Sequence, residues 1–175
     1  VQRAYVHDDV ADDFAAALEA SVAELVVGDP ADDATDVSAL IDDGETDRVA
    51  QTIAEALDAG ARAVTGGGRT EGGLVAPTVL TGVTNDMEVS RTEVFGPVVG
   101  VARYRNVDEA FELANDTRYG LQAGIFTNDL SLGLEAAHRL NFGGVCVNEV
   151  PTYRTDQMPY GGVKDSGNTK EGPAY

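Results

Sequence analysis

One short segment of the chain combines a carboxylate, an aromatic ring and a Gly-Pro turn. It reads Glu93-Val94-Phe95-Gly96-Pro97 and leads directly into the apolar run Val98–Tyr104. Gly tolerates unusual dihedrals and Pro fixes its own φ, so residues 95–97 predict a turn, and the β-branched run after them predicts a strand. A carboxylate fixed at the start of a strand suits the paired hydroxyls of a ribose, and an aromatic face suits a flat ring. A surface glutamate and a core phenylalanine are the structural alternative.

The chain contains one thiol, Cys146, inside the apolar strand Val145–Val147. A thiol buried among apolar residues is poorly reactive, so we interpret Cys146 as a core residue. His7 ends a predicted strand and His138 lies on a predicted helix, so no activating partner is evident. A single cysteine also excludes an internal disulfide and a cysteine-based zinc site, and no metal site is predicted.

The composition is that of a globular chain that can bury one good core. The 175 residues are 43% hydrophobic and 24% charged, which predicts a single domain, residues 1–175. The longest apolar runs have the length of strands, and no signal segment opens the chain, so a cytoplasmic location is the default expectation.

The charge is strongly acidic. Asp and Glu number 30 against 12 Lys and Arg, giving a net charge of −18. Such a field repels nucleic acids and anionic membranes, so neither is expected as a partner. Self-repulsion at low salt opposes folding, and the acid-rich, lysine-poor composition resembles that of proteins from salt-loving microbes.

The hydrophobic pattern predicts strands alternating with helices, and therefore an α/β fold with a doubly wound, mostly parallel sheet. Strands are expected over residues 2–7, 61–64, 74–80, 98–104, 123–126 and 145–148, and helices over residues 11–25, 46–59, 107–115 and 129–140. Asp8 and Asp9 are expected to cap the first helix, and Gly60 is expected in a left-handed C-terminal cap. Gly66–Gly68 predicts a mobile surface turn, because neither Lys-Ser/Thr nor a helix follows it, as a phosphate loop requires.

The last stretch, residues 149–175, has little periodicity and predicts an irregular, ordered loop after a strand. Ligands of α/β proteins are commonly placed in such loops at the carboxyl ends of strands. Tyr153 and Arg154 are therefore candidates to face a substrate.

Several of these segments together resemble the NAD(P)-dependent aldehyde dehydrogenase superfamily. The resemblance follows the family's order over nearly the whole chain. It comprises Glu93–Val98, Gly67-Gly68, Pro77–Leu80, Tyr119–Leu121, Val147-Asn148 and Pro159–Gly167. The resemblance implies that Glu93 binds the nicotinamide ribose, that Phe95 packs beside the nicotinamide, and that the cofactor is NAD or NADP.

The resemblance also implies that much of the catalytic machinery lies outside this chain. The family's nucleophile belongs to a Gly-Gln-x-Cys segment, which would end about three residues before Val1 by alignment with Val1–His7. The general base, the oxyanion donor and the N-terminal cofactor domain lie further upstream, and a final oligomerisation strand follows the matching region. In the family the thiol attacks the aldehyde, hydride passes to the nicotinamide, and water releases the acid. We therefore expect no catalytic residue in this chain, no activity of the chain alone, and homo-oligomers of the full-length protein.

The substrate is an aldehyde by this resemblance, and the pattern looks like subgroups acting on lactaldehyde, phosphonoacetaldehyde or succinate semialdehyde. Asn148 matches the family's Val-Asn at the substrate pocket, although a structural amide at a strand end is an equal alternative. Arg154 could bind an anionic group of the aldehyde, or could pair with Asp156 or another acid. Gly161–Lys164 resembles a segment that closes around the active site, with a structural role favoured.

Two other classes of function remain open from the sequence. One is a non-catalytic half-domain used for assembly or binding. The other, a self-contained Rossmann-type nucleotide binder, is weak because no Gly-x-Gly-x-x-Gly follows a strand.

Overall fold

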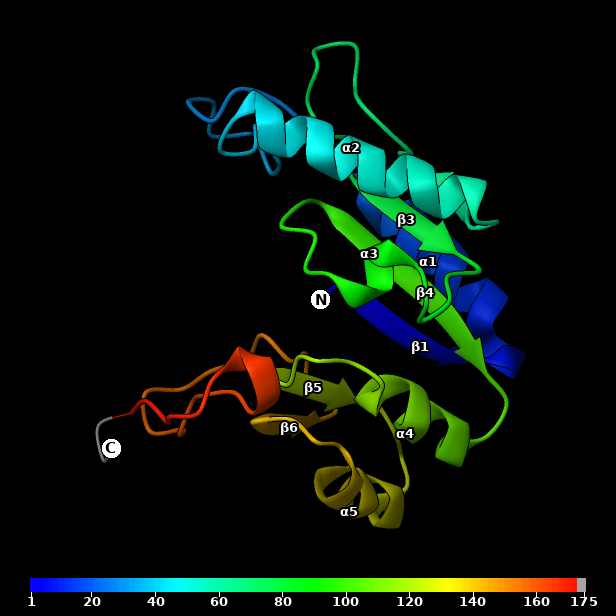
Figure 1. Ribbon diagram of the computed structural model, residues 1–175, viewed down its shortest axis with the longest axis vertical. Helices are drawn as coiled ribbons and strands as arrows, with labels where there is room; N and C mark the ends of the chain where they lie inside the picture. Colours follow the sequence, from blue (N-terminus) through cyan, green and yellow to red (C-terminus); the bar gives the residue numbers. More distant parts are fainter. Residues whose placement is uncertain (173–175) are drawn as a thin grey trace. The chain divides into compact units, whose positions relative to one another are not determined.

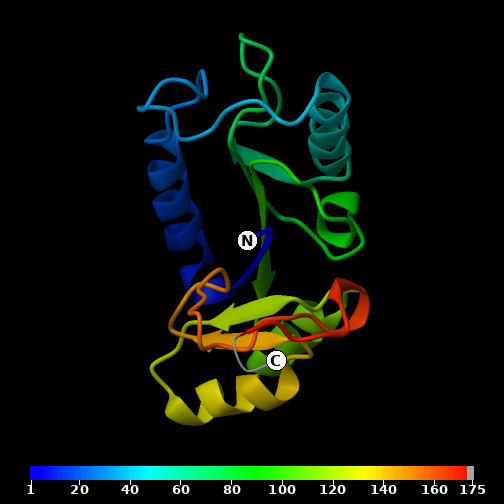
Figure 2. The same ribbon diagram turned by 90° about the vertical axis from the view of Figure 1, so that its left-hand side faces the viewer.

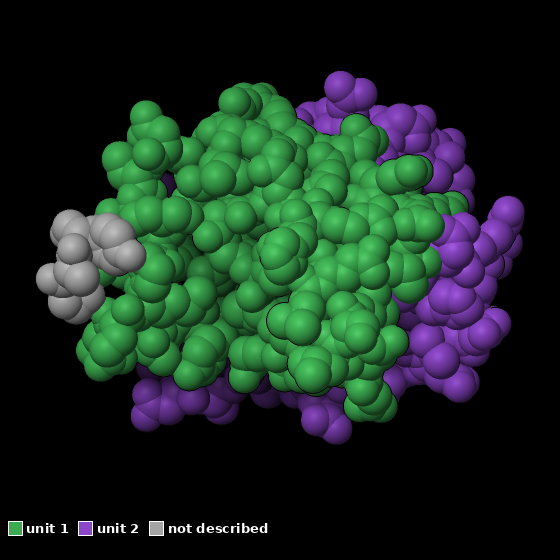
Figure 3. All heavy atoms as spheres, turned by 90° about the horizontal axis from the view of Figure 1, so that it is seen from below, with its two compact units in different colours: residues 1, 107–175 green, residues 2–106 purple. Residues whose placement is uncertain are grey.

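The computed structural model describes residues 1–172, and the chain divides into two compact units. One unit comprises residues 2–106, and the other comprises residue 1 and residues from 107 onward (Figure 3). Each unit is described by itself. The single domain expected from the chain length stays a prediction.

The first unit is a four-stranded sheet with helices on both faces. Its strand order is β1 (Arg3–His7), β4 (Val98–Tyr104), β3 (Thr78–Thr81) and β2 (Arg62–Thr65). The pairs β1–β4 and β4–β3 are parallel, and only the edge strand β2 runs antiparallel to its neighbour. Helix α1 (Ala11–Ala23) covers one face, and α2 (Asp43–Asp58) and the short α3 (Glu88–Arg91) cover the other (Figures 1 and 2). The predicted α/β fold with a mostly parallel, doubly wound sheet is confirmed.

The core of this unit follows the alternation of side chains along β3. Val79 packs in the cluster on the α1 face, and the next residue, Leu80, packs with Val49 and Ile53 of α2. Successive side chains of a strand point to opposite faces, so a strand buried on both faces must be apolar throughout. Val79 and Leu80 meet this requirement at 0% exposure. The polar Thr78, 2% exposed, is accommodated because its hydroxyl donates to the carbonyl oxygen of Ala76 at 2.7 Å.

The second unit is a β-α-β arrangement preceded by a helix. Helix α4 (Val107–Asn115) leads to β5 (Gln122–Ile125), and α5 (Leu130–Arg139) connects β5 to the parallel strand β6 (Gly144–Val147). Phe111 of α4 and Ala136 of α5 share a buried cluster with apolar residues of both strands. Asp129 caps α5 by accepting hydrogen bonds from the main-chain N–H groups of Ser131 and Leu132. The irregular segment after β6 contains one 3₁₀ turn, η2 (Lys164–Ser166).

Two local expectations near the start of the chain and in the third strand are wrong. Asp8 and Asp9 do not cap α1, because they form the 3₁₀ turn η1 (Asp8–Val10), and Val10 precedes α1 without a side-chain cap. The strand expected over residues 74–80 is limited to Thr78–Thr81, since Pro77 has no N–H to donate to a ladder. Residue 75 makes only an isolated bridge to Arg69.

The left-handed conformation expected for Gly60 is present, and Gly66 also has a positive φ. Gly60 follows α2 with φ 105°, as expected for a left-handed cap. Gly66 has φ 69°, and a Cβ there would lie 2.4 Å from the carbonyl oxygen of Pro77. Close backbone packing therefore requires a glycine at residue 66. The mobile surface turn predicted for residues 66–68 did not include this requirement.

No helix within residues 1–172 is long and apolar enough to cross a membrane. The same residues contain no group of three or more His, Cys, Asp or Glu side chains that could hold a metal ion.

Candidate functional site

The segment Glu93–Phe95 lies between α3 and β4 in the first unit and turns alternate side chains in opposite directions. Val94 is buried at 2% exposure in the cluster beneath α2. Its two neighbours point away from that core, since Glu93 is exposed and Phe95 is 72% exposed. The buried valine thus anchors the loop and leaves a carboxylate and an aromatic ring available to a ligand. Phe95 is not a core residue, so the structural alternative for it is wrong.

The backbone of this loop is unusual on both sides of the turn. Phe95 has φ 49°, a left-handed conformation that non-glycine residues adopt at a cost on the order of 1–2 kcal/mol. A Cβ at Gly96 would lie 2.8 Å from a methyl group of Val49 on α2, so only glycine lets the loop pass this close. An exposed aromatic residue in a strained conformation is typical of a functional position.

Two side chains that the sequence analysis did not single out hold the peptide groups of Val94. The Gln2 side-chain oxygen accepts a hydrogen bond from the N–H of Val94 at 2.9 Å. Arg48 on α2 donates to the Val94 carbonyl oxygen at 2.7 Å. The Arg48 guanidinium also binds Glu45, and the hydrogen bond between them raises the pKa of Arg48. No local sequence pattern predicts these contacts, because the partners of one are separated by 46 positions in the chain and those of the other by 92.

The Glu93 carboxylate makes no hydrogen bond or ion pair within the described residues. Such a carboxylate can accept hydrogen bonds from two vicinal hydroxyl groups, and the exposed ring of Phe95 can stack on a planar heterocycle. The residues present therefore fit the ribose and nicotinamide of NAD(P).

The Asn148 side chain, in the second unit, is occupied by main-chain hydrogen bonds. Asn148 follows β6 with φ 57°, and its amide accepts from the N–H of Thr127 at 2.8 Å and donates to the Thr127 carbonyl at 2.9 Å. This bridge ties together the segments that follow β5 and β6. The structural alternative for Asn148 therefore has direct support, and its contact with a substrate stays a prediction.

Tyr153 and Arg154 lie in the irregular segment after β6. Tyr153 is 49% exposed. The Arg154 guanidinium lies 4.4 Å from the centre of the Tyr160 ring and 3.5 Å from a Glu171 carboxylate oxygen. Residues 160 and 171 also pair through their main chains. The ion-pair partner found for Arg154 is thus Glu171, not the sequence neighbour Asp156.

The segment Gly161–Gly167 packs closely against the loops that lead into β5 and β6. Gly120 donates to the Ser166 hydroxyl at 2.9 Å and accepts from the N–H of Val163 at 2.9 Å. Arg118 binds Asp165 at 2.6 Å, and this hydrogen bond raises the pKa of Arg118. These contacts support the structural role favoured for the segment.

Cys146 is 8% exposed on β6, so its interpretation as a core residue is confirmed.

The candidate residues fall into two groups, with Glu93 and Phe95 in the first unit and Asn148, Tyr153 and Arg154 in the second.

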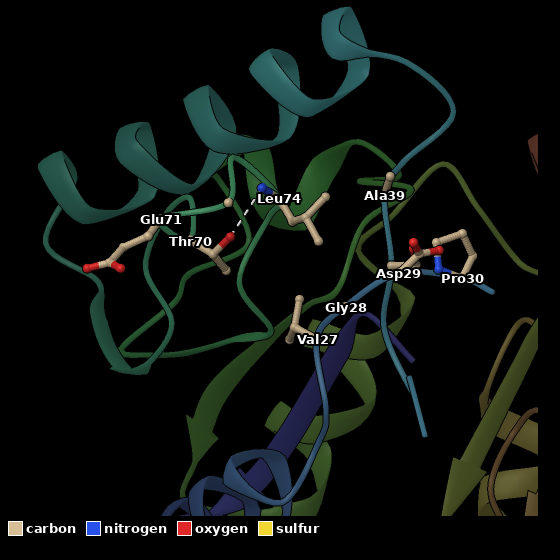
Figure 4. Close-up of a pocket in the computed structure, with 10 residues that line it drawn as sticks. Val27, Gly28, Asp29, Pro30, Ala39, Thr70, Glu71 and Leu74 are labelled. Carbon is tan, nitrogen blue, oxygen red and sulfur yellow. Dashed lines mark hydrogen bonds between the residues drawn. The ribbon is translucent and has the colours of Figure 1, made fainter. Parts of the chain in front are cut away.

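A surface hollow of the first unit is lined by none of these candidates. It opens between the loop that follows α1 and the turn at residues 70–74, where Thr70 accepts a hydrogen bond from the N–H of Leu74 (Figure 4). Its lining consists of Val27, Gly28, Asp29, Pro30, Ser38, Ala39, Thr70, Glu71, Gly72 and Leu74. No candidate residue lines this hollow, so it does not explain their placement.

Comparison with known proteins places these features in one family. The model of the aldehyde dehydrogenase family matches residues 1–175. The chain is 48% identical, over its whole length, to 3-sulfolactaldehyde dehydrogenase of Priestia aryabhattai, of which it covers 36%.

Two solved structures extend the likeness to the fold. Aldehyde dehydrogenase 21 of Physcomitrella patens, solved with its reaction product succinate, has a TM-score of 0.94 and 37% identity, over 100% of this chain and 36% of that one. A Mycobacterium tuberculosis aldehyde dehydrogenase complexed with NAD⁺ has a TM-score of 0.90 and 34% identity, over 98% of this chain and 36% of that one. The chain thus spans about a third of the length of its relatives. It belongs to the aldehyde dehydrogenase family.

Proposed function

We propose that this chain is the C-terminal part of the catalytic domain of an NAD(P)-dependent aldehyde dehydrogenase, in which Glu93 and Phe95 bind the nicotinamide half of the cofactor. The observation that carries the proposal is the loop at residues 93–95. It exposes an unpaired carboxylate and a strained aromatic ring on either side of a buried, hydrogen-bonded valine.

Each residue of the loop has a distinct part in this proposal. NAD(P), when bound, supplies the hydride acceptor for aldehyde oxidation. Glu93 accepts hydrogen bonds from the ribose hydroxyls and so fixes the position of the sugar. Phe95 packs against the nicotinamide and excludes water from one side of the ring. Val94 and Gly96 keep the loop against α2, so that both side chains are held before the cofactor arrives.

The nucleophile of the proposed reaction is a cysteine in a segment N-terminal to Val1. Attack by its thiolate on the aldehyde forms a thiohemiacetal, and the loss of hydride from that adduct gives a thioester that water hydrolyses to the acid. The buried Cys146 does not fit this role, since a nucleophile must be reached by substrate. We therefore expect the 175-residue chain alone to be inactive.

The proposed substrate is a small aldehyde that carries an anionic group. One relative is named for 3-sulfolactaldehyde, and another was crystallised with its reaction product succinate. Both of these small molecules carry an anionic group. Arg154 is the candidate to bind the anion, and Tyr153 and Asn148 are candidates to line the pocket. In the structure Arg154 is paired with Glu171, so substrate binding would require an exchange of that partner.

The first experiment is an assay of the full-length protein that contains this chain. We expect NAD(P)H formation with sulfolactaldehyde or succinate semialdehyde, and none from the 175-residue chain alone. An absence of dinucleotide binding and turnover by the full-length protein would refute the enzyme and favour the second candidate, a non-catalytic module for assembly or binding. Homo-oligomer formation and a cytoplasmic location are further proposals, tested by light scattering and by cell fractionation.

The substrate role of Arg154 has its own test. In the full-length enzyme, Arg154→Ala should raise the KM for an anionic aldehyde by about ten- to a hundredfold and leave that for a neutral aldehyde unchanged, because one charge-assisted contact is worth about 1.5–3 kcal/mol. Arg62→Ala, on the exposed edge strand β2, is the matched control for a lost surface charge. Equal changes for both aldehydes would assign Arg154 to the contact with Tyr160 and Glu171 only.

A further inference from the structure

The side chain of Gln2, the residue before β1, binds three main-chain groups in the segment from α3 to the Glu93–Phe95 loop. Its side-chain nitrogen donates to the carbonyl oxygens of Val89 at 2.9 Å and Thr92 at 2.8 Å, and its oxygen accepts from the N–H of Val94 at 2.9 Å. Both amide protons and the carbonyl are thus in use. Only the –NH₂ group can meet two carbonyl oxygens, so this network fixes which way the amide points.

The two carbonyl groups that accept from Gln2 receive no hydrogen bond from within helix α3. Helix α3 has four residues, so no further helical turn follows to satisfy the carbonyls of Val89, its second residue, and Thr92, the residue just after it. The main chain of Gln2 is itself fixed, because its carbonyl accepts from the N–H of Gly100 in β4 at 2.8 Å. The side chain therefore reaches from a rigid sheet to a short helix and the loop after it.

Arg48 of α2 holds the other peptide group of Val94. Its 2.7 Å hydrogen bond holds the Val94 carbonyl, while Gln2 holds the Val94 N–H and the valine side chain is buried. Each peptide group held in this way adjoins Glu93 or Phe95. A shift of either side chain's backbone would have to break one of these contacts.

We propose that Gln2 is a positioning residue for the cofactor, which acts by holding the Val94 peptide so that Glu93 and Phe95 meet the nicotinamide ribose and ring. This inference rests on the function proposed for the loop. A purely structural glutamine would support the fold without a preference for one substrate. A positioning glutamine acts on the dinucleotide in particular.

The test compares Gln2→Met with Gln51→Met in the full-length protein. Methionine preserves approximate length without the hydrogen bonds, and Gln51 is an exposed glutamine on α2 whose side-chain amide donates to Glu55 at 2.9 Å. For Gln2→Met we expect the KM for NAD(P) and the Kd for NAD(P)H to rise about tenfold, equivalent to about 1.4 kcal/mol, with the KM for aldehyde unchanged. Gln51→Met should change none of the three.

Hydrogen exchange at the Val94 amide gives a readout that does not depend on turnover. The exchange should be faster in Gln2→Met and unchanged in Gln51→Met. Gln2→Glu, the second variant if Gln2→Met does not fold, retains an acceptor for the Val94 N–H but places a carboxylate against two carbonyl oxygens. Because this repulsion should turn the side chain away from the Val94 N–H, Gln2→Glu should speed exchange at the Val94 amide and weaken NAD(P)H binding together.

The outcomes separate the two proposals. A parent protein that neither binds NAD(P)H nor oxidises aldehydes refutes the proposed function, and this is seen before any variant is made. An active parent whose Gln2 variants bind the dinucleotide normally, or whose KM values for aldehyde and NAD(P) rise together, overturns the positioning role alone.

Discussion

Phe95 combines three properties that a residue selected for folding would not need. It is 72% exposed, it is aromatic, and it has the positive φ of 49° that glycine adopts at least cost. A side chain that contributes little burial in a strained backbone is best explained by what it binds.

The exposed ring and the positive φ of Phe95 predict the effect of Phe95→Gly. The backbone strain is relieved while the unfolded chain gains entropy, so the free energy of unfolding should stay within about 1 kcal/mol of the parent. The KM for NAD(P) should rise at the same time, because the ring that packs on the nicotinamide is gone. Urea unfolding and steady-state kinetics of the full-length protein measure the two effects.

Asn148→Gly is the matched control, since Asn148 also has a positive φ of 57°. There the substitution removes both hydrogen bonds to Thr127, so we expect unfolding to become easier by about 1–2 kcal/mol. A comparable loss of stability in Phe95→Gly would show that the phenylalanine is structural and would contradict the cofactor role.

At the scale of elements, the segment after β6 is held by a glycine contact that leaves no room for a side chain. A Cβ on Gly143 would lie 1.7 Å from the carbonyl oxygen of Gly161. The Lys170 ammonium donates to the carbonyls of the same two glycines, at 2.9 and 3.0 Å. The approach of these two stretches is therefore specified by main-chain contacts.

Gly143→Ala should detach residues 161–170 from this position, because neither backbone can yield to a contact so short. We expect faster tryptic cleavage at Lys164 and Lys170 than in the parent protein. Gly68→Ala is the control, since a Cβ at Gly68 meets nothing within 4 Å and no positive φ is required there. Equal cleavage rates in the parent and Gly143→Ala would mean that the segment is held elsewhere.

The elements also show which parts of the structure a sequence can predict. The strand over residues 98–104 and the helix over residues 107–115 were predicted with the bounds that the structure has, because their apolar residues repeat with a clear period. The third strand was predicted too long, since apolar composition continues across Pro77 where the ladder cannot.

The candidate site was predicted less completely than the fold. The motif around Glu93 identified the loop, but its strained Phe95 and the hydrogen bonds from Gln2 and Arg48 depend on contacts between distant residues. Those contacts arise only when β1, α2 and β4 come together, and no local propensity encodes them. The ion pair between Arg154 and Glu171 was missed for the same reason, although the possible presence of some acidic partner was foreseen.

At the scale of the whole molecule, acidic residues outnumber basic ones so strongly that pairing cannot neutralise them. The net charge is −18, and the loop after α1 alone carries Asp29, Asp32, Asp33 and Asp36. Ion pairs do form within the described residues, as between Arg139 and both Asp108 and Glu135. These hydrogen bonds raise the pKa of Arg139, but most carboxylates have no basic residue to bind.

This imbalance predicts a stability that depends on salt. The Debye length falls from about 10 Å at 0.1 M salt to about 3 Å at 1 M, so added KCl screens repulsion between carboxylates that compaction brings together. We expect the urea midpoint of the full-length protein to rise between 0.1 and 1 M KCl, because screening weakens this repulsion in the folded state. Replacing Asp32 and Asp33 by lysine lowers the negative charge at one exposed loop and should reduce that rise. A midpoint that is the same in dilute buffer and in molar KCl would exclude salt adaptation as the reason for the acidic composition, because repulsion strong enough to require salt must weaken when it is screened.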